Sequence, residues 1–96
     1  MTSSDPRLLV LSERDNILVL AEPVEAGEIL NVCGTPVQVQ ASLGLGHKLA
    51  RSAIPEGKDV LKYGLPIGFA ARDISIGEHV HVHNLTSRYT VVEVME

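Results

Sequence analysis

The sequence predicts a small all-β domain. The chain has 96 residues, enough for one domain and too few for two, so we expect residues 1–96 to form a single unit. Its apolar residues occur in short, β-branched stretches, and few of them recur at helical spacing. Gly and Pro separate these stretches at roughly regular intervals, which is typical of compact β domains with tight turns. Aromatic residues make up only 3% of the chain, so the core must be aliphatic.

Eight stretches have the length and residue types of strands. In chain order they are Leu8 to Leu11, Asn16 to Leu20, Glu28 to Val32, Val37 to Gln40, His47 to Ala53, Asp59 to Tyr63, His79 to Asn84 and Thr90 to Val94. Three of them adjoin a recurring pattern, in which an apolar residue stands three positions before a glycine and another stands three positions after it. The pattern is centred on Gly27, Gly57 and Gly77. We interpret it as three similar corners, in which glycine supplies a positive φ between two apolar anchors.

Composition and charge exclude several classes of protein. The net charge is −4, and no basic cluster interleaves with aromatic residues, so a nucleic-acid partner is not expected. No apolar run approaches the roughly 20 residues that a membrane-spanning helix needs. The first residues lack the pattern of a signal peptide, and the single cysteine, Cys33, has no partner for an internal disulfide. We therefore expect a cytoplasmic protein.

A short stretch with Gly44, Gly46, His47 and Lys48 is a candidate site, because it places an imidazole and an ammonium group side by side after a glycine-rich turn. It lacks the spacing of a dinucleotide fingerprint or a P-loop. No Asp or Glu occurs between Ile29 and Pro55, whereas half of the basic residues lie between positions 48 and 62. This charge distribution favours a site for an anion such as a carboxylate, although scattered solvated charges are the simpler interpretation.

Two further groups of residues are candidates for chemistry. Lys62 could contact an anion, and Tyr63 is expected to point to the opposite face and to fill the core or an edge, if the strand continues to both. His79, His81 and His83 alternate with valine. In a strand they would share one face, either as metal ligands or as a solvated polar face opposite buried Val80 and Val82. No Ser-His-Asp or zinc-type cysteine pattern is discernible, which argues against a self-sufficient hydrolase.

Taken in order, several of these motifs closely resemble the SAF-type domain of the altronate and galactarate dehydratase family. The resemblance covers residues 46 to 85, and Asp15-Asn16 with the apolar run after them extends it more weakly toward the start. The motifs are Gly46-His47-Lys48-Leu49-Ala50, Ile54-x-x-Gly57, Val60-x-Lys62-Tyr63-Gly64-x-x-Ile67-Gly68-x-Ala70 and Ile74-x-x-Gly77-x-x-Val80-His81-Val82-His83-Asn84-Leu85. The chain departs from the family at Leu11-Ser12-Glu13-Arg14, where a His-Pro pair is frequent.

The resemblance implies a β-clip fold and a particular division of labour. In that family the domain is part of a sugar-acid dehydratase, or a free-standing small subunit as in sulfolactate sulfo-lyase, and it works with a larger catalytic partner. We therefore expect an accessory subunit of a hydroxy-acid lyase that is not active alone, with a divalent metal, iron above all, shared with the large subunit. The alternative is a non-catalytic β-clip module that binds a protein or carbohydrate, like the antifreeze-like domain of sialic acid synthases.

The same resemblance suggests roles for individual residues. His47, Lys48 and His83 are expected to act in catalysis, and Lys48, Lys62 and Asn84 to bind the substrate. His81 and His83 are the expected metal ligands, since both lie within the family-like stretch and His79 precedes it. A third ligand would come from His47 or from the partner, because the outer two of three alternate residues in a strand stand about 13 Å apart.

Overall fold

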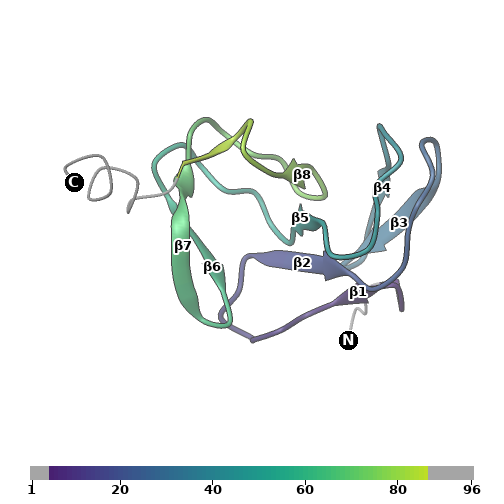
Figure 1. The fold of residues 1–96 in the computed structure, drawn as a ribbon, viewed down its shortest axis with the longest axis horizontal. Coiled ribbons are helices and arrows are strands. Elements are labelled where there is room, and N and C mark those ends of the chain that lie inside the picture. The colour runs from purple at the N-terminus through teal and green to yellow at the C-terminus, as the bar shows by residue number, and fades with distance from the viewer. Residues whose placement is uncertain (1–4, 87–96) are drawn as a thin grey trace.

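The structure, a computed structural model, describes residues 5–86 and is all-β. Within these residues nine strands form three antiparallel sheets, which are arranged as a central sheet with a hairpin on each side (Figure 1). The central sheet has the order β1-β2-β5-β8, with bounds Leu8–Leu9, Ile17–Leu20, Lys48–Ala50 and His79–Val80. One hairpin pairs β3 (Ile29–Val32) with β4 (Thr35–Gln38). The other pairs β6 (Asp59–Lys62) with β7 (Leu65–Ala70), and β9 (Leu85–Thr86) lies beside β7.

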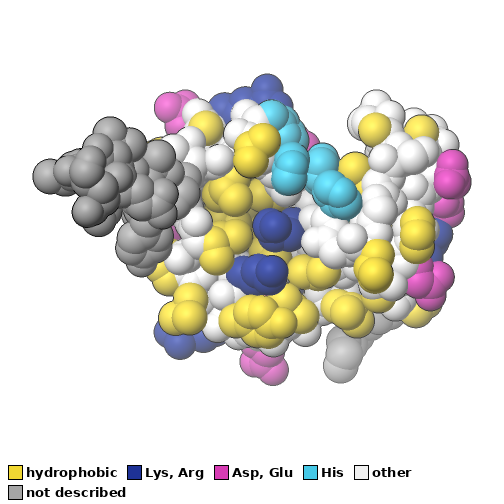
Figure 2. All heavy atoms as spheres, viewed as in Figure 1, with side chains coloured by type: hydrophobic (Ala, Val, Ile, Leu, Met, Phe, Trp, Pro, Cys, Tyr) yellow, Lys and Arg dark blue, Asp and Glu magenta, His cyan; other side chains and the backbone are white. Residues whose placement is uncertain are grey.

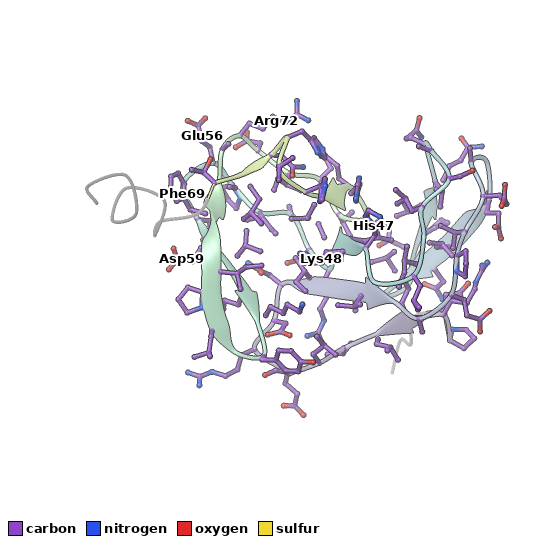
Figure 3. The ribbon with its side chains drawn as sticks, viewed as in Figure 1. His47, Lys48, Glu56, Asp59, Phe69 and Arg72 are labelled. Atoms are coloured by element: carbon purple, nitrogen blue, oxygen red, sulfur yellow. The ribbon has the colours of Figure 1, made fainter. Side chains whose placement is uncertain are left out.

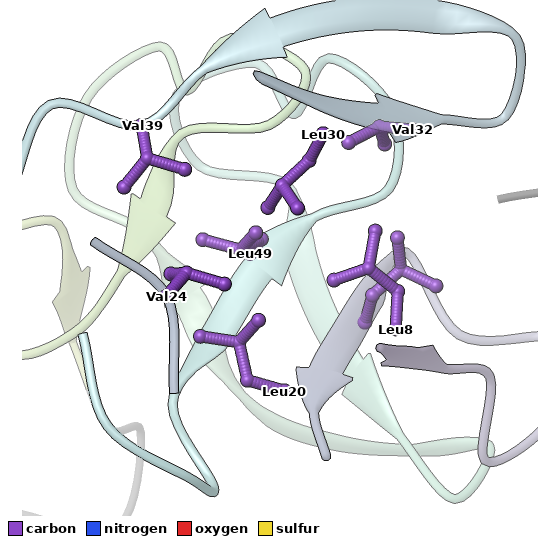
Figure 4. Close-up of a cluster of buried hydrophobic side chains, with 8 residues drawn as sticks. Leu8, Leu20, Val24, Leu30, Val32, Val39 and Leu49 are labelled. Carbon is purple, nitrogen blue, oxygen red and sulfur yellow. The ribbon is translucent and has the colours of Figure 1, made fainter. Parts of the chain in front are cut away.

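Two clusters of buried side chains lie on opposite faces of the central sheet. Along β5, Leu49 belongs to the cluster that the β3–β4 hairpin covers, and Ala50 belongs to the cluster of the β6–β7 hairpin, as strand alternation requires. Figure 4 shows the first cluster, with Leu8, Leu20 and Leu30 packed around Leu49. Both clusters are aliphatic, as the composition predicts.

The predicted corners are present, and there is a fourth. Gly27, Gly57 and Gly77 all have positive φ, and so does Gly46, which stands between the apolar residues Leu43 and Leu49. In each corner the glycine N–H donates to a carbonyl oxygen of another segment, at 2.7 to 2.8 Å. The fourth corner has the same spacing but is not among the three expected from the sequence. It is the corner that carries His47 and Lys48.

The strand predictions were right for most of the chain, but they missed β7 and β9 and made the histidine strand too long. β7 was missed because Pro66 and Gly68 suggested loop rather than strand. Pro66 is tolerated beside a register shift between Val60 and Leu61. Gly68 allows β9 to come close, since a Cβ there would lie 2.5 Å from the Thr86 carbonyl oxygen.

The second error concerns the histidine strand, which we expected to run from His79 to Asn84. It ends at Val80, and residues 81–84 form a turn. The predicted strand from Thr90 to Val94 lies outside the described residues. The part of the chain that the structure describes has no helix long and apolar enough to cross a membrane.

Candidate functional site

Three imidazoles converge at the edge of the central sheet. His47 directly precedes β5, and His79 lies in β8 opposite Leu49 of β5, so strand pairing brings the two together. Nδ1 of His47 and Nε2 of His79 are 3.0 Å apart. His81 completes the group, and one ring nitrogen of each of the three residues lies within 4.8 Å of the others. We call His47, His79 and His81 the histidine cluster.

Asn84 builds the turn that folds His81 back toward His79. Its Oδ1 accepts a hydrogen bond from the His81 N–H at 2.9 Å, and its Nδ2 donates to the His79 carbonyl at 2.9 Å. The rings of His79 and His81 consequently stack, with centroids 5.3 Å apart and an interplanar angle of 11°. Asn84 is 0% exposed. It is expected from the sequence to bind the substrate, and both ends of its amide already make hydrogen bonds within the chain.

The arrangement differs from the alternating row expected from the sequence. His79, which we had set aside, lies at the centre, because its ring contacts those of His47, His81 and His83. His83 is exposed and does not belong to the converging three, although its centroid is 5.6 Å from that of His79. The corner spacing in the sequence was the signal for the position of His79. His79 stands two positions after the corner glycine Gly77, just as Lys48 stands two positions after Gly46.

The environment keeps the central imidazole neutral. Partial burial lowers the pKa of His79 to about 4, and the nearby cationic forms of His47, His81 and His83 and the Lys48 ammonium lower it in the same direction. A neutral ring retains a lone pair on one nitrogen, which is the form that a metal ion binds.

Lys48 follows His47 and lies on the same face of β5 as Ala50, which packs in the cluster of the β6–β7 hairpin that carries Lys62. Burial lowers the pKa of Lys48, and the charge of Lys62 lowers it further. Neither of them forms an ion pair within residues 5–86. Figure 2 shows basic side chains in the middle of this face, surrounded by apolar ones and with histidines beside them, and Figure 3 labels His47 and Lys48 there.

The condition under which Lys62 and Tyr63 would point to opposite faces is not met, because β6 ends at Lys62. Tyr63 has a φ of 56° and forms a two-residue turn with Gly64, whose φ is 75°. The Lys62 Nζ lies 5.8 Å from the centroid of the Tyr63 ring. Tyr63 is 64% exposed, so it does not fill the core or an edge as expected.

A groove of about 450 Å³ adjoins the histidine cluster. It lies between β4 and the corner at Gly77, and His79 and His83 stand at its edge. Its apolar wall is formed by Val37, Val39, Leu43, Leu49 and Ile76. His79 and His83 therefore border an apolar groove.

These features define a small β-clip domain that presents imidazole and ammonium groups on one face. The chain belongs to the altronate/galactarate dehydratase SAF domain family, whose match covers residues 6–88. This confirms the resemblance seen in the motifs.

Named relatives place the domain in two contexts. The chain is 39% identical to an altronate dehydratase of Bacillus subtilis over 86% of its length and 41% identical to one of Escherichia coli over 73%. It spans only 17% and 14% of those two proteins. It is also 36% identical, over 74% of its length, to the (2R)-sulfolactate sulfo-lyase subunit alpha of Chromohalobacter salexigens, of which it covers 82%. The domain thus occurs both as a small part of a long enzyme and as most of a subunit.

Proposed function

We propose that this chain is an accessory domain or small subunit of a dehydratase or related lyase that acts on a hydroxy acid or sugar acid together with a larger catalytic polypeptide. The family match supports this role, as does the coverage of a relative that is itself named as a subunit. A non-catalytic binding module is the alternative, but such a module has no need of three converging imidazoles beside two lysines that form no ion pair within residues 5–86.

The histidine cluster is proposed to hold a divalent metal ion, with iron as the first candidate. Nitrogen ligands at about 2.0–2.1 Å from one ion lie at most about 4.2 Å from each other, so ring nitrogens already within 4.8 Å need only small movements. Imidazole suits iron as well as zinc. Three ligands leave positions for substrate and for groups of the partner. When bound, the metal would act as a Lewis acid for an oxygen of the substrate.

The lysines are proposed to hold the substrate carboxylate. Elimination takes a proton from the carbon beside that carboxylate and expels the hydroxyl of the next carbon as water, so it needs both a base and an acid. Lys48 and Lys62 have no competing carboxylate within residues 5–86 and can bind the anion. His83, exposed beside the cluster, remains our candidate for proton transfer, and His47 is the second.

Single histidine substitutions test the metal site. We expect His47→Ala, His79→Ala and His81→Ala each to weaken binding of Fe²⁺ or Co²⁺ to the purified chain by at least about tenfold, measured by calorimetry, because each removes one ligand. His83→Ala is the matched control and should change metal affinity by less than threefold. If His83→Ala loses metal binding and His79→Ala keeps it, the result would favour His81 and His83, the pair of metal ligands expected from the sequence. Unchanged binding in all four variants would reduce the cluster to scaffolding.

A further inference from the structure

A buried carboxylate outside the histidine cluster holds the tip of the β6–β7 hairpin. Asp15 is only 4% exposed, and its two oxygens accept hydrogen bonds from the N–H groups of Tyr63 at 3.0 Å and Gly64 at 2.7 Å. Arg51 holds the loop from the other side by donating to the carbonyl oxygens of Glu13 and Asp15. Hydrogen bonds to an ionised acceptor are among the strong ones in proteins, so this contact fixes the tip firmly.

The next residue fixes the strand that leads into the tip. Oδ1 of Asn16 accepts from the Leu61 N–H at 2.8 Å, and its Nδ2 donates to the Asp59 carbonyl at 2.9 Å. Together, Asp15 and Asn16 hold the backbone on both sides of Lys62. Each contact joins residues more than forty positions apart.

The β3–β4 hairpin shows that a two-residue turn does not require contacts from a distant loop. Cys33 and Gly34 form an equivalent two-residue turn, with φ values of 51° and 91°. There the Gly34 N–H donates to Oδ1 of Asn31, three positions earlier, at 2.7 Å. The corresponding position before Gly64 is Leu61, which has no acceptor. The second hairpin therefore depends on a distant loop for a contact that the first hairpin makes locally.

Tyr63, whose N–H is held by Asp15, is an unusual residue for the first position of a two-residue turn. A side chain with a Cβ resists positive φ, and Asn or Gly normally begins turns of this type. Tyr63 begins this one, with its ring exposed and near the Lys62 ammonium. A backbone conformation that the residue itself disfavours must be maintained from outside, and the Asp15 carboxylate provides that support.

We infer that Asp15 and Asn16 are positioning residues, which hold Lys62 beside Lys48 and so set the geometry of the anion site from the N-terminal loop. The inference rests on the proposed function in one respect, namely that the two lysines bind a carboxylate. The position of Lys62 itself does not depend on that assumption.

The test compares Asp15→Asn and Asn16→Ala with the matched control Asp73→Asn, which alters a carboxylate that accepts one backbone N–H at 2.9 Å from Glu56. Two quantities are measured on the folded chain by NMR: the contact between Lys62 and the Tyr63 ring, and the affinity for tartrate. We expect both loop variants to weaken the contact and to reduce tartrate affinity about tenfold. Asp73→Asn should leave both unchanged.

A second substitution separates positioning from general stability. Adding Leu61→Asn to Asp15→Asn copies the local acceptor of the first hairpin, and it should restore the Lys62–Tyr63 contact and the tartrate affinity. If Asp15→Asn does not fold, Asn16→Ala decides alone. Folded loop variants with the wild-type Lys62–Tyr63 contact would overturn the inference. Absence of tartrate binding in the wild type would instead refute the carboxylate role, while the Lys62–Tyr63 contact would still judge the positioning.

Discussion

The chemistry of this chain depends on where single side chains stand relative to positive charge. His79 lies among three other imidazoles and Lys48, and burial acts on its pKa in the same direction as those charges. Its ring therefore stays neutral well below the pH at which a free histidine is protonated. Protonation of His79 in acid is therefore unfavourable in the folded chain.

This leads to a prediction for the metal-free chain. His79 has an ordinary pKa of 6.5 and a folded-state pKa of about 4, so the unfolded chain takes up a proton first as the pH falls. The contribution of His79 to the free energy of unfolding is fully present above pH 6.5 and is lost as the pH falls toward 4. The loss is about 1 kcal/mol, because solvent screens the charges around this partly exposed ring. Denaturant titrations with chelator should show a shallower decline for His79→Gln. Identical slopes in both proteins would contradict the assigned environment.

At the scale of elements, the repeated corner is the unit from which the domain is built. It occurs at Gly27, Gly46, Gly57 and Gly77, and isolated bridges pair the first with the second and the third with the fourth, through Val24 with Leu43 and Ile54 with Ile74. The corners differ in their surroundings. A Cβ at Gly57 would meet nothing within 4 Å, whereas one at Gly77 would lie 2.5 Å from the Val37 side chain.

Alanine at these two glycines should therefore have unequal effects. Both substitutions force a residue with a Cβ to positive φ, at a cost of about 1–2 kcal/mol. Gly77→Ala must in addition push Val37 and β4 away, which costs about 1–3 kcal/mol more. Chemical denaturation of the two variants measures the difference in unfolding free energy. Equal losses would mean that the β3–β4 hairpin does not pack against this corner as described.

The elements also show how far the sequence predicts the structure. Apolar anchors around glycine predicted three corners, because that pattern is local. Lys48, Lys62 and His47 were predicted as site residues from the charge distribution and the motifs. The turn after Val80 was not predicted, since it depends on the side chain of Asn84 bonding to the main chain. β7 was not predicted because the reason for Gly68 is the approach of β9, which is a tertiary contact. Asp15 was passed over for the same reason, since its partners lie in a distant hairpin.

At the scale of the whole molecule, the candidate site is open. Lys62 and Tyr63 lie at a hairpin tip, His81 and His83 are exposed, and the site has no lid within residues 5–86. Eliminations need a water-poor environment around the reacting groups, which such a surface does not provide. A further domain or a second polypeptide would have to enclose it.

We therefore expect the isolated chain to be folded and catalytically silent. Purified chain with Fe²⁺ should give no turnover of altronate, galactarate or sulfolactate, and activity should appear when a large subunit that co-purifies with the native protein is added. In that complex Lys48→Ala should reduce substrate affinity about ten- to a hundredfold, since one charge-assisted hydrogen bond is lost. Substantial metal-dependent turnover by the chain alone would refute the subunit role.

The central sheet has a consequence for how the molecule comes apart. Both hydrophobic clusters rest on β2 and β5, with Leu18 and Leu49 in one and Ile17 and Ala50 in the other. When either cluster opens, these strands lose their packing on one face, and the support of the remaining cluster is lost with it. The two halves therefore have no separate melting temperatures, and heat should unfold them in one cooperative transition. A ligand that joins His47 to His79, across β5 and β8, would strengthen both halves at once.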